Sequence, residues 1–274
     1  MLNDRHLVIN AVHLAAAPAL PGAGLLHYSD PLCSRSFSRS MRRFQWKRFA
    51  GRGNLPRLFP GNDMATLASR LQAAVQPHDL LSHPFYQAWS MGQLTRADLA
   101  GYAAQYLHQV ESLPSLLTIA RGAAPETIDR NLEEEKGHAE LWSRFAAAVG
   151  ARPEPQQVET LQSREELRAL CSEGDVEALA ALWAYEMQTA RVSRTKRLGL
   201  TERYGVSEVA FFTLHEQLDV HHAADLIAEL ERRCGASEDL TRRACDAAKR
   251  SAQAQWHFLD GGPRSAGPSP LSRW

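Results

Sequence analysis

The feature that most constrains the fold is a helical spacing of apolar residues, which continues from Met64 almost to the end of the 274-residue chain. In the segment that begins at Thr95, apolar side chains recur three, four and seven positions apart, as they do on one face of a helix. No segment after Met64 shows the alternation of apolar and polar residues that is typical of a half-buried strand. We therefore predict an all-α protein, a compact bundle of seven or eight helices with short connections. The predicted helices cover residues 64–75, 80–90, a long segment from 95, 126–149, short turns at 163–172, 175–198, 207–233 and 238–259.

Charge is unevenly distributed, although the 31 basic and 31 acidic residues balance. Residues 1–63 hold nine Lys/Arg against three Asp, which gives +6, so the rest of the chain carries −6. The acid-free stretch 34–57 buries too little apolar surface to offset its ordering entropy, so we predict that residues 1–63 form a disordered basic extension. In an alternative interpretation the start is mis-assigned and the protein begins at Met64. We expect one domain over 64–260, followed by a flexible tail at 261–274 that is rich in Gly, Pro and Ser.

The composition argues against several classes of protein. The four cysteines contain no Cys-x-x-Cys pair, which disfavours a zinc ribbon or a disulfide framework and fits a reducing cytosol. No run of eighteen apolar residues exists, so we expect no helix that spans a membrane. The acidic region after Met64 disfavours contacts with nucleic-acid phosphates. We therefore expect a cytoplasmic protein that binds neither membranes nor nucleic acid.

The most specific chemical motif lies in the predicted helix 207–233. His215, Asp219 and His222 are spaced i, i+4 and i+7, which places them within an arc of about 60° around the helix axis. Two imidazoles and a carboxylate on one face suit a divalent transition metal. Burying three such groups on an otherwise apolar face would be costly without a partner. The alternative is a solvated face on which the histidines occur by chance.

A second motif lies in the predicted helix 126–149. Glu135 and His138 have the Glu-x-x-His spacing with which helical dimetal proteins present a pair of ligands inward. Glu134 and His138 are i and i+4, so Glu134 competes with Glu135 for this role. Runs of acids on helices are mostly solvated, so this motif alone is weak evidence for a metal.

The third candidate is an isolated carboxylate, Glu186, among large apolar side chains such as Trp183 and Met187. A buried carboxylate needs a cation or a hydrogen-bond partner. Arg191 or Arg194 could supply that partner, and this pairing is the alternative to a metal. Together the three motifs offer six protein ligands, a number that suits two iron or manganese ions with positions left for dioxygen better than zinc.

The sequence resembles the heme-oxygenase-like dimetal oxidases, which share their fold with TenA/PqqC-like proteins, and within them the chlamydial CADD-like branch. The resemblance covers roughly residues 67–259, and its last motif is the most specific, whereas several others also occur in relatives that use no metal. The motifs are His83-Pro-Phe-Tyr86-Gln-Ala-Trp, Gly92-Gln-Leu-Thr95, Tyr102-Ala-Ala-Gln-Tyr106, Asn131-Leu-Glu-Glu-Glu, Tyr185-Glu186-x-Gln188, Gly199-Leu-Thr-Glu202-x-Tyr204-Gly and His215-Glu-x-x-Asp219-Val-x-His222-Ala.

The resemblance implies a homodimer that holds two iron ions, or a manganese–iron pair, and uses dioxygen as a co-substrate. The implied ligands are Glu135 (or Glu134), His138, Glu186, His215, Asp219 and His222. One departure is that the CADD-like pattern has a longer gap between the acid and the histidine of the first pair, which leaves the choice between Glu134 and Glu135 open.

The CADD-like branch is associated with the synthesis of para-aminobenzoate for folate, in which a tyrosine of the protein itself supplies the ring and a lysine is implicated as the nitrogen donor. The matching positions are Tyr86 for the sacrificed tyrosine, Tyr185 beside Glu186, and Lys196. A further tyrosine of the family pattern is Phe211 in this chain. The structural alternatives are a Tyr86 that only packs in the core and a Lys196 on the surface.

Three other functions compete with this one. A dimetal oxidase of the same fold could act on a free amino acid or fatty acid, for which a substrate-sized cavity would be evidence. A metal-free TenA/PqqC-like enzyme is disfavoured by the six candidate ligands and by the lack of a convincing nucleophilic cysteine. A binding or regulatory protein is the third, and the acidic charge after Met64 disfavours its binding to DNA.

Overall fold

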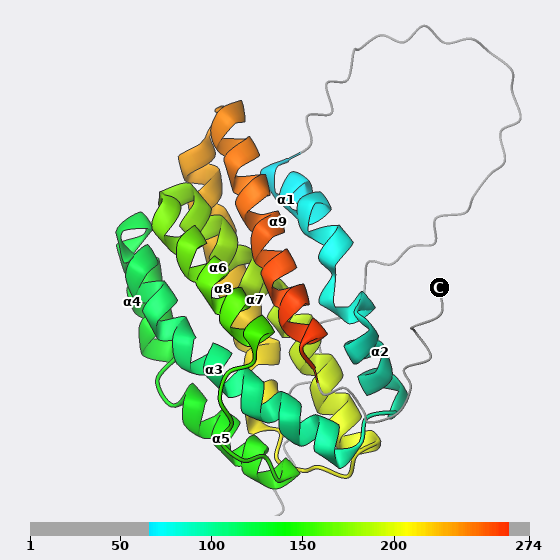
Figure 1. The fold of residues 1–274 in the computed structure, drawn as a ribbon. Coiled ribbons are helices and arrows are strands. Elements are labelled where there is room, and N and C mark those ends of the chain that lie inside the picture. Colours follow the sequence, from blue (N-terminus) through cyan, green and yellow to red (C-terminus); the bar gives the residue numbers. More distant parts are fainter. Residues whose placement is uncertain (1–65, 263–274) are drawn as a thin grey trace, which may run out of the picture. The chain divides into compact units, whose positions relative to one another are not determined.

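The computed structural model describes residues 66–262 and confirms the all-α class, since these residues form helices and no strand (Figure 1). The α-helices are α1 (Leu67–Val75), α2 (Pro84–Met91), α3 (Arg96–Ala120), α4 (Pro125–Glu134), α5 (His138–Val149), α6 (Val158–Glu173), α7 (Asp175–Glu202), α8 (Ala210–Cys234) and α9 (Glu238–Asp260). Three 3₁₀ turns complete the described part: η1 (Gln76–His78), η2 (Leu80–Ser82) and η3 (Arg121–Ala123).

Some predictions concern residues beyond those described. The predicted basic extension 1–63 lies outside the described residues, and so does the predicted tail 261–274 apart from its first two glycines. The domain boundaries therefore stay predictions. Within residues 66–262, every helix is too short or too polar to cross a bilayer.

Helix α3 begins where the sequence predicts it to begin. The hydroxyl of Thr95 accepts a hydrogen bond from the backbone N–H of Asp98 at 3.1 Å, and the Asp98 carboxylate accepts one from the N–H of Thr95 at 2.7 Å. This reciprocal capping satisfies N–H groups that have no partner inside the helix. The helix then continues through Pro114 to Ala120.

Two segments differ from the predicted helices. The helix predicted over 126–149 is divided into α4 and α5, because Gly137 adopts a φ of 89°, a left-handed conformation that glycine adopts without a steric penalty. The short turns predicted at 163–172 are instead part of the 16-residue α6, which packs Leu167 and Leu170 into the core. Because many residues of α6 are polar, the helical spacing of its apolar residues is weak in the sequence. Packing against α3, α7 and α9 stabilises this helix.

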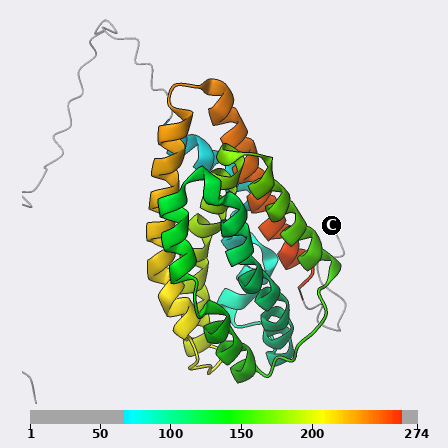
Figure 2. The same cartoon turned by 90° about the vertical axis from the view of Figure 1, so that its left-hand side faces the viewer.

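Helix α7 is the centre of the bundle. It packs against α6, α8 and α9 and also touches α2 and α3, so that residues around its whole circumference are buried. Consecutive helices α8 and α9 form a helical hairpin beside it, drawn from yellow to red in Figure 2. Glu186 and Lys196 on α7, and the polar residues on the inner face of α8, are therefore buried away from water.

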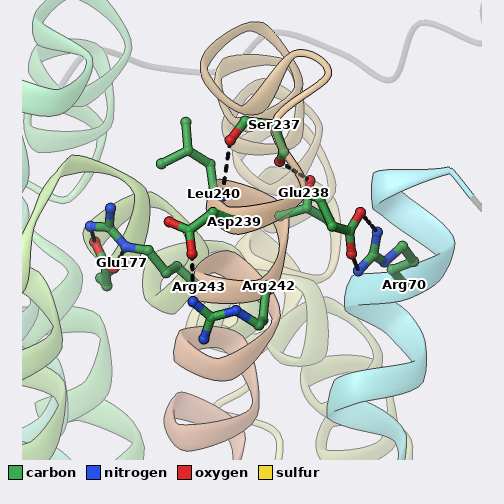
Figure 3. A network of polar contacts seen from close by, with 9 residues as sticks. Arg70, Glu177, Ser237, Glu238, Asp239, Leu240, Arg242 and Arg243 are labelled. Carbon is green, nitrogen blue, oxygen red and sulfur yellow. Dashed lines mark hydrogen bonds and ion pairs between the residues drawn. The ribbon is translucent and has the colours of Figure 1, made fainter.

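Polar contacts join the start of α9 to its neighbours (Figure 3). Glu238 forms a two-pronged ion pair with Arg70 of α1 at 2.6 and 2.7 Å, and Arg243 forms another with Glu177 of α7 at 2.7 and 3.0 Å. The Ser237 hydroxyl caps the helix by accepting a hydrogen bond from the N–H of Leu240. Such partly exposed pairs each contribute little to the free energy of unfolding, because water and salt screen the attraction. Their role is to fix where the helix ends meet.

Helices α2 and α7 approach each other closely at a glycine. A Cβ atom added to Gly199 of α7 would lie 2.6 Å from the indole nitrogen of Trp89 of α2, and this nitrogen donates a long hydrogen bond of 3.4 Å to the backbone oxygen of Lys196. Because Gly199 has no side chain, the fully buried Trp89 ring lies directly on α7. This contact is one helical turn from Tyr86 on α2 and one turn from Lys196 on α7.

Candidate metal centre and its surroundings

Helix α8 carries three candidate ligands on its buried face. His215, Asp219 and His222 are all buried, Asp219 completely, whereas the neighbouring His221 is exposed. The predicted alternative of a solvated face is therefore wrong for these three residues. Their helical spacing places them together, and the packing of α8 against α7 encloses them.

The six candidate ligands form two buried groups of three. In the first, Glu135, His138 and His215 offer ligand atoms that all lie within 4.8 Å of one another. In the second, the same is true of the ligand atoms of Glu186, Asp219 and His222. Helix α8 contributes to both groups, α7 contributes Glu186, and the break between α4 and α5 contributes Glu135 and His138.

Several polar atoms in these groups have no hydrogen-bond partner among the described residues. They are both carboxylate oxygens of Asp219 and Nδ1 of His222. Buried polar atoms without a partner are rare and costly, and burial raises the pKa of both the Asp219 and the Glu186 carboxyl groups. A divalent cation would satisfy the orphaned atoms and neutralise the acids, so the donor set fits two iron-type ions.

The alternative partner for Glu186 is not used. Arg191 pairs with Asp79 at 3.1 Å, and Arg194 lies 3.8 Å from Glu216, so both arginines have other carboxylates. The Glu186 carboxylate instead lies 3.8 Å from Nδ1 of His222. The predicted Glu186–arginine alternative is therefore wrong.

The structure separates Glu134 from Glu135. Glu135 is buried and accepts from Nδ1 of His138 at 2.8 Å, within the first group. The side chain of Glu134 is 37% exposed and accepts from Nε2 of His222 at 2.7 Å, beside the second group. Without a cation, the contacts with Glu186 and Glu134 raise the pKa of His222 to about 9. When a cation takes the place of the Nδ1 proton, the contact with Glu134 keeps the remaining ring proton on Nε2. Glu134 thus orients a candidate ligand, while Glu135 is itself placed to bind.

The two glutamates can be distinguished by substitution. We expect Glu135→Gln to remove one ion per chain, because it deletes a charged ligand atom. Glu134→Gln should keep both ions but weaken metal affinity by about 10- to 100-fold, the usual effect of losing a group that orients a ligand. Metal titration of both variants, with the exposed Glu133→Gln as the control, measures the difference. Equal metal loss in the two variants would contradict this assignment.

Four tyrosines form a row of contacts that leads to the second group, where Tyr106 and Tyr185 line the cavity beside Glu186 and Asp219. The hydroxyls of Tyr86 and Tyr102 lie 3.2 Å apart, those of Tyr106 and Tyr185 lie 3.5 Å apart, and the rings of Tyr102 and Tyr106 are 5.5 Å apart. Tyr185 adjoins the candidate ligand Glu186 in the sequence. The tyrosines therefore form a continuous row from Tyr86 to the metal centre. Sequence analysis did not assign Tyr102 and Tyr106 a role, although their i, i+4 spacing places both on one face of α3.

Lys196 is buried in an aromatic cage, so the alternative of a surface lysine is wrong. Its ammonium nitrogen lies 4.4–5.7 Å from five ring centroids, and within the described residues it forms no ion pair. Burial lowers the pKa of Lys196 to about 7, with Asp219 opposing the shift. About half of the amine is therefore neutral at pH 7. The rings belong to Tyr86, Tyr102, Tyr106, Trp142 and Phe212.

The cavities at this site are small. One of about 20 Å³ is lined by Tyr86, Tyr106 and Tyr185, and another of about 10 Å³ adjoins Glu186 and Asp219. Each has room for about one water molecule. The site can therefore admit a diatomic gas or water, but an organic substrate would require it to open. Phe211, which replaces a tyrosine of the family pattern, stacks on His215 at 3.9 Å.

Known proteins resemble this chain in both sequence and fold. The sequence model of the family described as "Iron-containing redox enzyme" matches residues 97–256. The chain belongs to this family. Two relatives named 4-aminobenzoate synthase support the family assignment. The one from Chlamydia trachomatis serovar D is 30% identical over 209 residues, covering 70% of this chain and 89% of the relative. The one from Nitrosomonas europaea is 32% identical over 229 residues, covering 72% and 90%.

Solved structures confirm the heme-oxygenase-like, TenA-like bundle. A domain of unknown function with a heme oxygenase-like fold from Shewanella denitrificans has a TM-score of 0.63 at 16% identity, covering 72% of this chain and 91% of that one. A TenA homologue from Pyrococcus furiosus has a TM-score of 0.63 at 14% identity, covering 71% and 98%. This family member is therefore a redox enzyme on a TenA-like scaffold, with carboxylates and histidines grouped as an iron-type centre would need.

Proposed function

We propose that the protein synthesises 4-aminobenzoate (para-aminobenzoate) for folate from its own Tyr86, with Lys196 as the nitrogen source. The observation that carries this proposal is the contact between the two groups, because the Lys196 nitrogen lies 5.6 Å from the centroid of the Tyr86 ring. Both groups are buried next to the candidate metal centre. The relatives named 4-aminobenzoate synthase support the same reaction.

Glu135, His138 and His215 would hold one ion, and Glu186, Asp219 and His222 the other. We propose two iron ions or a manganese–iron pair, with dioxygen as the co-substrate. When bound, such a centre supplies the oxidising power that an aromatic side chain requires. The pKa of His215, lowered to about 3 by burial and by His138, keeps this imidazole neutral and able to bind a metal.

The residues around Tyr86 have distinct roles in this proposal. Lys196 in its neutral form is a nucleophile, and the aromatic cage excludes water that would compete with it. The Tyr185 hydroxyl contacts that of Tyr106, and the Tyr86 hydroxyl contacts that of Tyr102, so protons and electrons can pass along the row of tyrosines. Tyr185 precedes the candidate ligand Glu186 in the chain and would link this row to a bound metal.

The small cavity size disfavours the rival oxidase that acts on a free amino acid or fatty acid. Pockets that bind such molecules have volumes of about 300–1,000 Å³, whereas the cavity beside Tyr86 has about 20 Å³. A substrate that is already part of the core needs no such pocket. The orphaned Asp219 oxygens likewise disfavour a metal-free enzyme or a binding protein, because no group among the described residues forms a hydrogen bond with them.

We also propose a cytoplasmic homodimer. The thiols of Cys171, Cys234 and Cys245 are free, which fits a reducing compartment. The homodimer rests on the family resemblance alone, and sedimentation of the full-length protein measures it directly.

Isotopic labelling of lysine tests the nitrogen source. We expect iron-loaded protein that carries ¹⁵N in its lysine side chains to release ¹⁵N-4-aminobenzoate after exposure to dioxygen and a reductant. Lys196→Met should lower the yield by at least about 100-fold, since it removes the nucleophile but preserves the length and packing of the side chain. The exposed Lys136→Met is the matched control. Unlabelled product from the labelled protein would refute Lys196 as the donor.

A further inference from the structure

A polar groove lies on α7 outside the metal centre. It has a volume of about 330 Å³, and its walls come from α1, η1 and α7 together with Asp79, which precedes η2. Val75 and Met187 provide apolar surface, and Gln188 and Arg191 provide hydrogen-bond donors. A volume of this size can hold a small aromatic molecule.

Gln188 lines this groove and has an unused donor below the groove surface. Its side chain is 3% exposed, and its Oε1 accepts a hydrogen bond from the backbone N–H of Leu80 at 2.8 Å. Because that contact needs an acceptor, the orientation of the amide is defined and its other end is Nε2. Nε2 is buried and has no hydrogen-bond partner among the described residues. A buried donor without a partner in the wall of a groove points to an acceptor on a ligand.

Arg191 adds a cation at the same wall. Its guanidinium donates one hydrogen bond to Asp79 at 3.1 Å, so most of its five N–H groups remain available. A planar guanidinium suits a carboxylate. Asp79 partly offsets the positive charge, which favours weak binding of an anion over tight retention.

The groove and the cavity beside Tyr86 lie on opposite sides of the same two backbone segments, which form a partition between them. Leu80 lines the inner cavity while its neighbour Asp79 lines the groove, and on α7 Thr189 lines the inner cavity while its neighbour Gln188 lines the groove. The hydrogen bond from Leu80 to Gln188 joins the two sides of this partition. An aromatic molecule formed at Tyr86 therefore has the groove as its neighbouring space.

We propose that this groove binds an aromatic carboxylate, the released 4-aminobenzoate, as the product leaves the core. The ring lies against Met187 and Val75, and the carboxylate accepts hydrogen bonds from Gln188 Nε2 and Arg191. The proposal rests on the proposed function for the identity of the ligand. It adds an exit site to a protein whose product would otherwise remain enclosed.

Photolabelling of the iron-loaded, full-length protein tests this site. The probe is 4-azidobenzoate, which keeps the carboxylate of the product and carries a photoreactive azide in place of the amine. We expect labels on the groove segments 72–79 and 187–191, and we expect added 4-aminobenzoate to compete. Equilibrium dialysis should show that Arg191→Gln weakens 4-aminobenzoate binding by about tenfold or more. Arg194→Gln is the matched control, because Arg194 lies on the same helix outside the groove and should leave binding unchanged.

Several results of these experiments would contradict the proposed binding site in the groove. Labels elsewhere, no saturable binding, or equal effects of the two arginine variants would overturn the site. Aniline, which lacks the carboxylate, should bind at least tenfold more weakly than benzoate, and equal binding would also overturn it. Because the ligand is added from outside, the assay is independent of synthesis. Binding without any product from Tyr86 would refute the proposed function alone, and product without binding would refute the groove alone.

Discussion

Asp219→Asn is expected to lower the 4-aminobenzoate yield at least about 100-fold and to remove at least one of the two ions. Asp219 is fully buried within the second group of candidate ligands, and both of its oxygens lack a hydrogen-bond partner among the described residues. The amide has nearly the shape of the carboxylate but lacks its negative charge. The substitution therefore weakens the attraction for a cation and leaves the packing intact.

The same variant should have the opposite effect on the protein without metal. There, burial and the neighbouring Glu186 and Glu135 disfavour the Asp219 carboxylate, and Lys196 offsets this cost only in part. Removing one of these charges should raise the free energy of unfolding by about 1–3 kcal/mol. In a chain of this size, each kcal/mol raises the melting temperature by about 2–4 °C.

Metal analysis and thermal unfolding, each with and without a chelator, measure both effects. The control is Asp225→Asn on the same helix, a partly exposed residue that pairs with Arg130 at 2.5 Å. This control should leave the metal content unchanged. It should not raise the free energy of unfolding of the metal-free protein. A metal-free Asp219→Asn protein that melts below the metal-free wild type would argue that Asp219 has a structural role.

Tyr86→Phe is the second substitution with a large expected effect, the loss of all detectable 4-aminobenzoate. If Tyr86 supplies the ring, the phenol oxygen and the ring electrons that it activates are part of the reaction. Phenylalanine has no phenol oxygen, so its ring is not activated. The fold should be retained, because within residues 66–262 the hydroxyl makes a single hydrogen-bond contact, 3.2 Å from the Tyr102 hydroxyl. The loss of one such contact costs about 1 kcal/mol.

Intact-mass and peptide mass spectrometry after one reaction cycle should find the loss of a tyrosine ring at position 86 of the wild type. Tyr204→Phe is the matched control, since it also deletes one tyrosine hydroxyl, which donates to the backbone oxygen of Trp89 at 2.9 Å. This control should make product at the wild-type level. Undiminished product from Tyr86→Phe would exclude the self-substrate reaction and restore the rival that uses a free substrate.

The all-α class and the inner face of α8 could be predicted from local patterns. The spacing of His215, Asp219 and His222 is a property of one helix, and the helical repeat places them on one face whatever the rest of the fold. The start of α3 was predictable for the same reason, because Thr95 and Asp98 cap each other within four residues.

Features that depend on contacts between distant segments could not be predicted in this way. The sequence predicts that the Glu-x-x-His pair belongs to one continuous helix, but the pair lies at the break where Gly137 separates α4 from α5. The separate roles of Glu134 and Glu135 depend on where each one meets α8 from that break, Glu134 at His222 and Glu135 near His215. The alternatives for Glu186 and Lys196 failed for a related reason, because the central position of α7 buries residues that its sequence alone could place on the surface.

The contact of Trp89 with Gly199 has a consequence for recognising this activity in other chains. It sets the distance between two backbones at the turn next to Tyr86 and Lys196, so the separation of the two reactive groups depends on a position that has no functional group. A homologue could keep the reactive tyrosine, the lysine and every ligand, yet hold the first two apart through a single methyl group at this position. Searches for enzymes that consume their own side chains should therefore weigh the glycine as heavily as the residues that react.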